Sequence, residues 1–235
     1  MQRISRISRV SRLSTPRGLA AAAWSPPLGS VVRKEPRLFT PGPLTTSATV
    51  KQAMLVDLGS RDPGMIRVIQ ECRDGLLAMA GTSQAAGFEC VLVQGSGTFA
   101  IESVVSSVVP PPAQGGKLLV VSNGAYGLRM AQMARMGGID VELLECSERE
   151  APTAAAVVAA VKEKGPFTHV GMIHHETTAG TLNPVEEVGA ALRSHDAGIS
   201  FIVDSMSAFG AYDCDLEAGN VAYLVHMDPC CGFLK

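Results

Sequence analysis

No stretch of this sequence is long and apolar enough to cross a membrane. A spanning helix needs roughly 18 or more consecutive apolar residues, and charges or glycines interrupt every apolar run here. Zinc-ligand and disulfide frameworks are also missing, because the six cysteines are scattered and contain no C-x-x-C pair. What remains is a chain of 235 residues, 46% hydrophobic and 18% charged, which can bury a large core. The composition predicts a globular domain without a metal site, in a reducing compartment.

Acidic residues are absent from residues 1–34, which carry seven basic ones, whereas the rest of the chain has 13 basic and 22 acidic residues. From Arg3 to Ser14 an Arg–aliphatic–Ser tripeptide occurs four times, which on a helix gives a basic amphipathic surface. An Arg- and Ser-rich segment without acids predicts a mitochondrial transit peptide over residues 1–34, disordered and leading to the matrix. The alternatives are a basic tail on a cytoplasmic protein and an artefactual start.

Short apolar runs alternate with helical patterns after the turn Pro41-Gly42-Pro43. The expected strands are Cys90–Val93, Lys117–Val121, Val141–Leu144, His169–Ile173, Ile199–Val203 and Val221–Val225. The expected helices span 47–57, with Ser47 as N-cap, 65–80, 99–107, 125–136, 152–164 and 185–195. Apolar strands separated by helices predict an α/β fold, three layers with a mainly parallel sheet, over residues 35–225.

Ligands of such sheets bind at the carboxyl ends of the strands, so the residues there carry the functional prediction. Gly95-Ser96-Gly97-Thr98 leads from an expected strand into a helix, where backbone amides and the helix dipole favour a phosphate. Gly95, Gly97 and Ala100 also fit the dinucleotide pattern G-x-G-x-x-A. The acidic residue that this pattern requires after the next strand is missing, and a plain tight turn with a helix cap stays an alternative.

Asp204 follows the apolar run Ile199–Val203 and is expected to face the same crevice. It could cap the next turn, ligate a metal or pair with a cationic heterocycle such as the pyridine ring of pyridoxal phosphate (PLP). His174 and His175 are expected to make ordinary hydrogen bonds, because adjacent side chains on a strand diverge. A phosphate loop and a strand-end aspartate on one edge together suggest PLP.

Several segments in the same order resemble class V, fold-type-I aminotransferases, and most closely the members that act on 2-aminoethylphosphonate and pyruvate. The resemblance covers about Leu38 to Leu224, and these segments carry it: Thr40 to Thr46, Gln94 to Thr98, Val121 to Gly127, His175 to Pro184 and Val203 to Ser207.

The resemblance implies PLP as cofactor. Ser96, Gly97 and Thr98 would hold its phosphate. Its ring would be contacted by three side chains, of which Tyr126 would stack on it, Thr177 would approach its oxygen and Asp204 would pair with its nitrogen. The implied reaction converts 2-aminoethylphosphonate and pyruvate to phosphonoacetaldehyde and L-alanine. The implied partners are small molecules and a second copy of the chain in a homodimer, with no nucleic acid and no membrane.

The catalytic lysine of the family falls near Cys230 in this sequence, and no lysine lies between Lys164 and Lys235. Residues 226–235 depart from the family pattern, and the small C-terminal domain is expected to be missing. The resemblance therefore predicts a chain truncated before its catalytic lysine, either as a true isoform or through an error in the gene model, and inactive alone. Three alternatives stay open: an alanine:glyoxylate or serine:pyruvate type transaminase, an NAD-dependent dehydrogenase, and a non-catalytic binding module.

Overall fold

A computed structural model describes residues 37–39 and 45–227, all within one compact unit, Arg37–Lys235. Three predictions concern residues outside the described ones: the transit peptide over residues 1–34, the turn at residues 41–43 and the divergent tail around Cys230 and Lys235. The boundaries expected at residues 34 and 225 therefore stay predictions.

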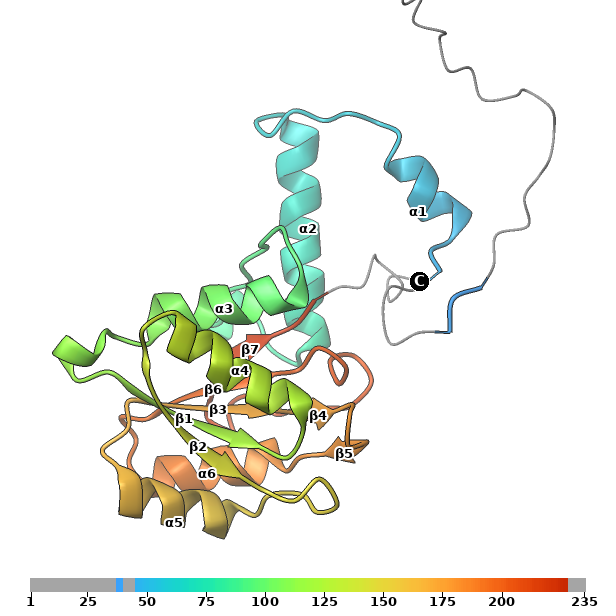
Figure 1. Ribbon diagram of the computed structural model, residues 1–235. Helices are drawn as coiled ribbons and strands as arrows, with labels where there is room; N and C mark the ends of the chain where they lie inside the picture. The colour runs from blue at the N-terminus through green and yellow to red at the C-terminus, as the bar shows by residue number, and fades with distance from the viewer. Residues whose placement is uncertain (1–36, 40–44, 228–235) are drawn as a thin grey trace, which may run out of the picture. The chain divides into compact units, whose positions relative to one another are not determined.

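The core of the unit is a five-stranded sheet in the order β2-β1-β3-β6-β7, and every neighbouring pair of strands is parallel (Figure 1). The strands are β1 (Lys117–Ser122), β2 (Asp140–Glu145), β3 (His169–Ile173), β6 (Ser200–Asp204) and β7 (Val221–Val225). The three inner strands, β1, β3 and β6, are buried along almost their whole length. The predicted parallel sheet is confirmed, and five of the six expected strands lie within one residue of their predicted bounds.

Helices cover both faces of the sheet, which gives the three layers. α3 (Gly97–Val108) and α4 (Ala125–Met136) pack on one face, and α5 (Ala154–Lys164) and α6 (Val185–His195) pack on the other. Successive residues of β1 serve the two cores alternately: Leu118 and Val120 contact the α3–α4 side, and Leu119 and Val121 contact the α5–α6 side. Both cores are apolar, which explains why the central strands are apolar at nearly every position.

Two further helices precede this sheet in sequence, α1 (Ala48–Ala53) and α2 (Pro63–Met79). Ser47 is the N-cap of α1, as predicted, and accepts a hydrogen bond from the Val50 amide at 3.3 Å. α1 is shorter than the expected 47–57. Two short 3₁₀ turns lie at Gln84–Ala86 and Pro112–Gln114. None of the described helices is long and apolar enough to span a bilayer.

The prediction of a strand at Cys90–Val93 was wrong. These residues have no strand partner among the described residues, and Val91, Leu92 and Val93 are 78%, 50% and 50% exposed. A strand is stabilised by pairing and burial, and an apolar run alone supplies neither. A second difference is the small antiparallel pair β4 (His175–Glu176) and β5 (Thr181–Leu182), which sequence reasoning did not predict.

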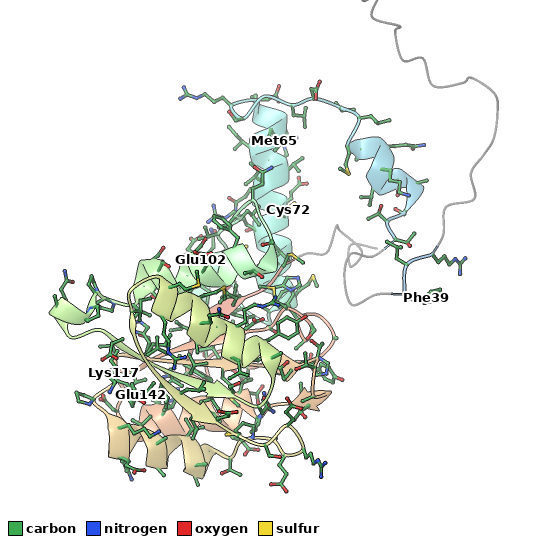
Figure 2. The ribbon with its side chains drawn as sticks, viewed as in Figure 1. Phe39, Met65, Cys72, Glu102, Lys117 and Glu142 are labelled. Atoms are coloured by element: carbon green, nitrogen blue, oxygen red, sulfur yellow. The ribbon has the colours of Figure 1, made fainter. Side chains whose placement is uncertain are left out.

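Polar groups at the amino end of the sheet serve a structural role. Lys117, at the start of β1, places its Nζ 3.7 Å from a carboxylate oxygen of Glu142 on β2 and 3.0 Å from the Lys164 carbonyl (Figure 2). Exposed ion pairs of this kind contribute at most about 1 kcal/mol.

The four cysteines among the described residues, Cys72, Cys90, Cys146 and Cys214, are free and half-buried. Burial raises the pKa of the Cys214 thiol to about 11, so this thiol is unreactive at neutral pH.

Candidate active site

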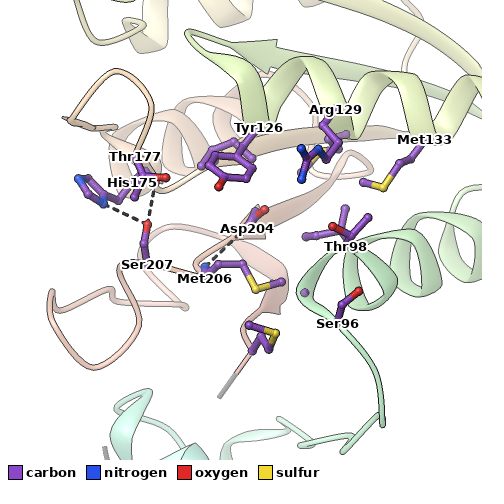
Figure 3. A pocket seen from close by; sticks show the side chains of 15 residues that line it. Ser96, Thr98, Tyr126, Arg129, Met133, His175, Thr177, Asp204, Met206 and Ser207 are labelled. Carbon is purple, nitrogen blue, oxygen red and sulfur yellow. Dashed lines mark hydrogen bonds between the residues drawn. The ribbon is translucent and has the colours of Figure 1, made fainter. Parts of the chain in front are cut away.

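A cavity of about 330 Å³ opens at the carboxyl ends of β3 and β6. Its volume lies in the range of small-molecule sites, about 300–1,000 Å³. The lining contains all six residues to which the sequence assigned a cofactor role: Ser96, Gly97, Thr98, Tyr126, Thr177 and Asp204. They come from four separate parts of the chain and are brought together by the parallel sheet. In Figure 3, Asp204 lies between the turn that carries Ser96 and Thr98 and the segment that carries Thr177.

The turn at Ser96 begins α3. Ser96 is the N-cap of this helix, and its Oγ accepts a hydrogen bond from the Phe99 amide at 3.2 Å. The amides of Gly97 and Thr98, in the first turn, have no partner among the described residues and are available to an anion. The preceding Gly95 has φ 153°, in the region that favours glycine. The helix cap and the anion-binding geometry therefore coexist, so the two interpretations of this loop do not compete.

Asp204 ends β6 and is 7% exposed. Its Oδ1 accepts a hydrogen bond from the Met206 amide at 3.0 Å, and no other hydrogen bond to its side-chain carboxylate occurs among the described residues. Burial raises the pKa of Asp204 to about 6, the Met206 hydrogen bond opposes this rise and the charge of Glu176 adds to it. The site thus holds a carboxylate that is costly to ionise until a cation faces it.

The two histidines make the ordinary hydrogen bonds predicted for them. His174 Nδ1 lies 3.2 Å from Ser205 Oγ, and His175 Nδ1 lies 3.0 Å from Ser207 Oγ. Burial lowers the pKa of His174, which favours a neutral imidazole. Within the described part of the chain, no three His, Cys, Asp or Glu residues are grouped so that they could share a metal ion.

Four residues of α4 line the cavity, and two of them, Tyr126 and Arg129, are polar. Tyr126 is 40% exposed, and the guanidinium carbon of Arg129 lies 5.4 Å from the centre of its ring (Figure 3). Arg129 was missed from the sequence, although its position three residues after Tyr126 places both on one face of the helix. Other lining residues were also missed: Ile101, Met130, Met133, Ile173, Met206, Ser207 and Met227. The apolar residues of this set gave no functional signal, and Met206 and Ser207 were visible only as residues that closely follow Asp204.

Residues 57–225 match the family model of class-V aminotransferases. The chain belongs to the class-V aminotransferase family. Its fold is that of the large domain of fold-type-I PLP-dependent aminotransferases, and the cofactor of this class-V family is PLP.

Named relatives support the same family. The chain is 44% identical over 189 residues to the 2-aminoethylphosphonate--pyruvate transaminases of Klebsiella pneumoniae and Salmonella typhimurium, a match that covers 80% of this chain and 50% of each relative. The crystal structure of alanine--glyoxylate aminotransferase from Nostoc sp. superposes with a TM-score of 0.66 at 29% identity, over 77% of this chain and 46% of that one. Pyridoxamine-pyruvate aminotransferase from Mesorhizobium loti shares the fold, with a TM-score of 0.70 at 24% identity, over 80% and 46%. The class-V chain therefore spans about half the length of the curated relatives it matches.

The cavity of this class-V chain fits PLP. The free amides of Gly97 and Thr98 suit a phosphate, and the buried Asp204, with one oxygen unused among the described residues, suits a protonated ring nitrogen. The exposed face of Tyr126 between them suits an aromatic ring. An anion-binding group and a carboxylate at two places in one cavity match the opposite charges at the two ends of PLP.

Proposed function

We propose that this protein is a PLP-dependent aminotransferase that moves the amino group of 2-aminoethylphosphonate to pyruvate, giving phosphonoacetaldehyde and L-alanine. The observation that carries the proposal is the meeting of Ser96, Thr98, Tyr126, Thr177 and Asp204 around one cavity. The identity of 44% to relatives with that named activity supports this choice of substrates. The alanine:glyoxylate and serine:pyruvate reactions are the alternatives within the family.

The roles that the family resemblance implies are compatible with the local geometry. Ser96, Gly97 and Thr98 would hold the phosphate at the start of α3, where the helix dipole would add to the hydrogen bonds. Tyr126 would stack on the ring, and Thr177 would donate to the ring oxygen, since both line the cavity. Asp204 would keep the ring nitrogen protonated, because a buried carboxylate favours a cationic partner. When bound, PLP supplies the electron sink that stabilises negative charge at the substrate carbon.

The activity is tested on the protein isolated from its own cells. We expect alanine to form from 2-aminoethylphosphonate and pyruvate at least about tenfold faster than from serine and pyruvate, because a different amino donor loses the site's contacts to the phosphonate. Faster turnover of alanine with glyoxylate would transfer the proposal to that alternative.

The 235-residue chain expressed alone is expected to bind PLP, seen as a visible absorption band, and to form no alanine, since the family's lysine position falls near Cys230. Alanine formation by this chain alone would contradict that expectation.

We propose a homodimer, and the same preparations test it by sedimentation. The support is the exposed apolar surface of α2, where Ile66, Val68 and Ile69 are 55%, 45% and 37% exposed. Exposed apolar patches on a folded unit favour association. A monomer at micromolar concentration would contradict the proposal.

We also propose a location in the mitochondrial matrix, supported by the acid-free, Arg- and Ser-rich composition of residues 1–34. Residues 1–34 fused to a fluorescent reporter are expected to direct it to mitochondria. A fusion in which each arginine of this segment is replaced by glutamine is the control, and it should stay in the cytosol. Cytosolic fluorescence of the unaltered fusion would contradict the proposal.

A further inference from the structure

Glu176 is a fully buried carboxylate for which the proposed chemistry gives no role. Its exposed fraction is 0%, and it lies on β4, directly before Thr177 of the cavity wall. No cationic side chain pairs with it among the described residues. A buried charge without an ionic partner must be stabilised by hydrogen bonds or dipoles, because desolvation is otherwise too costly.

The partners of Glu176 are the first backbone amides of α4, about 50 residues earlier in the chain. Oε2 accepts from the Tyr126 amide at 3.1 Å and from the Gly127 amide at 3.2 Å. Oε1 accepts from the Thr178 hydroxyl at 2.6 Å and from the Thr178 amide at 3.3 Å. The same hydroxyl oxygen accepts from the Ala125 amide at 3.0 Å. Glu176 and Thr178 together satisfy the first three amides of the helix.

α4 has no cap of its own that could replace them. Its N-cap residue is Gly124, which has no side chain to accept a hydrogen bond. A Cβ at Gly124 would lie 2.7 Å from Thr178 Oγ1 and would overlap the Glu176 side chain. Glycine at this position therefore permits β4 to approach the start of α4 closely. The Glu176 carboxylate then lies at the N-terminus of the helix, where the helix dipole favours a negative charge.

This contact joins two walls of the cavity. Tyr126, whose amide is held by Glu176, supplies the ring on one wall, and Thr177, between Glu176 and Thr178, supplies the neighbouring wall. The helix start cannot move relative to β4 without breaking hydrogen bonds to a buried charge, which are among the stronger ones in proteins. Figure 3 shows Tyr126 and Thr177 facing the same space.

We propose that Glu176 is a positioning residue, whose carboxylate anchors the first turn of α4 and so holds Tyr126 in the place where it stacks on PLP. The role of Tyr126 rests on the proposed function, whereas the anchoring does not depend on a ligand. Glu176 acts through Tyr126 and does not itself line the cavity.

The first test is amide hydrogen exchange of the ligand-free chain. In Glu176→Gln the side chain keeps its size, but one amide oxygen replaces two charged acceptors. We expect the amides of Ala125, Tyr126 and Gly127 to exchange about tenfold to hundredfold faster, while the β1 and β3 amides keep their protection. Glu187→Gln is the matched control, since Glu187 is exposed in the first turn of α6. Unchanged exchange at the three amides in Glu176→Gln would refute the anchoring.

The second test separates positioning from general support of the fold. PLP affinity is measured for wild type, Glu176→Gln, Tyr126→Ala and the double variant, at a temperature where all are folded. We expect Glu176→Gln to weaken binding about tenfold in the wild-type background and by less than about twofold when Tyr126 is already alanine. An equal loss in both backgrounds would overturn the positioning role.

The tests also provide for a Glu176→Gln variant that does not fold and for a wild-type chain that does not bind PLP. If Glu176→Gln does not fold, Thr178→Val takes its place in both tests, because it removes the hydroxyl that donates to Glu176 Oε1 and accepts from the Ala125 amide. Unchanged exchange at Ala125, Tyr126 and Gly127 in that variant would then refute the anchoring. A wild-type chain that fails to bind PLP would refute the proposed cofactor site and with it the role of Tyr126, whereas the exchange result would still decide whether Glu176 anchors α4.

Discussion

Replacing Asp204 by asparagine is expected to weaken PLP binding about hundredfold near pH 7.5, while the ligand-free protein becomes at least as stable as wild type. Asparagine keeps the shape and can accept the Met206 amide through its Oδ1, so the local turn is preserved. It removes the negative charge that faces the ring nitrogen, and losing one partner of a buried charged pair costs about 2–5 kcal/mol in binding. In a complete enzyme, turnover is expected to fall by a similar factor.

The gain in stability follows from the pKa of Asp204, which is about 6 in the folded protein against 3.8 for the ordinary side chain. The folded protein binds this proton more tightly than the unfolded chain does, so stability falls as pH rises from about 4 to about 6 and stays lower above that. The loss is on the order of 3 kcal/mol. Urea unfolding at two pH values measures it, and wild type should lose this stability between about pH 4 and about pH 7 while Asp204→Asn does not.

The pH dependence of PLP binding is the control that shows whether the effect of Asp204→Asn comes from the lost negative charge. Below about pH 6 the wild-type carboxyl is protonated and no longer attracts a cationic ring, so its advantage over Asp204→Asn should shrink by about tenfold for each further pH unit. The phosphate of PLP titrates near the same pH, but it does so with both proteins, and the ratio of the two dissociation constants removes it. A constant ratio from about pH 5 to about pH 8 would contradict the assigned role.

Gly189→Ala is expected to destabilise the protein by about 3 kcal/mol, a fall in Tm of roughly 6–12 °C. Gly189 lies in α6, where a Cβ would overlap the backbone carbonyl of Gly219 and lie 3.0 Å from the Phe201 ring. The helix and the segment around Gly219 cannot separate easily. Arg193 donates to the Glu217 carbonyl at 2.9 Å, and Glu186 accepts the Asp215 amide at 2.7 Å.

Gly75→Ala is the matched control for Gly189→Ala. Gly75 is also inside a helix, α2, but nothing lies within 4 Å of the Cβ that alanine would add. Alanine there should raise stability by about 0.5–1 kcal/mol, because glycine is the weaker helix former. Thermal unfolding of both variants without ligand gives the comparison. Equal melting temperatures for the two variants would contradict the close approach at Gly189.

The sequence predicted the sheet well where burial and pairing act together. His169–Ile173 is apolar at nearly every position because helices cover both of its faces, so the run and the strand have the same bounds. At Cys90–Val93 the same kind of run misled, because nothing in the run shows whether a partner strand lies beside it. A local pattern shows how apolar a segment is, but pairing with neighbouring strands in the tertiary structure decides whether the segment forms a strand.

Features of the candidate site likewise fall into those that a local sequence pattern could predict and those that it could not. Asp204 and the Ser96–Thr98 turn could be predicted, because a polar group after a buried strand and a glycine-rich helix start are both local signals. The link between Glu176 and α4 could not, since it joins residues about 50 positions apart and neither segment alone shows an unsatisfied group. Arg129 lies between these cases, because its spacing from Tyr126 was visible but its direction depends on how α4 packs.

The parallel connections of the sheet also affect the order of events during folding. β1 pairs with β3, about 50 residues later, and Asp204 reaches the cavity only when β6 has paired with β3. Each pairing requires closing a long loop before any contact compensates for the lost chain entropy, so such topologies fold slowly. A nascent chain would leave one edge of β3 unpaired until about residue 204 had emerged. With the roles proposed for Ser96–Thr98 and Asp204, PLP could not assist at that stage, since the two segments proposed to hold its charged ends are more than 100 residues apart, and the cofactor would stabilise only a sheet that has already formed.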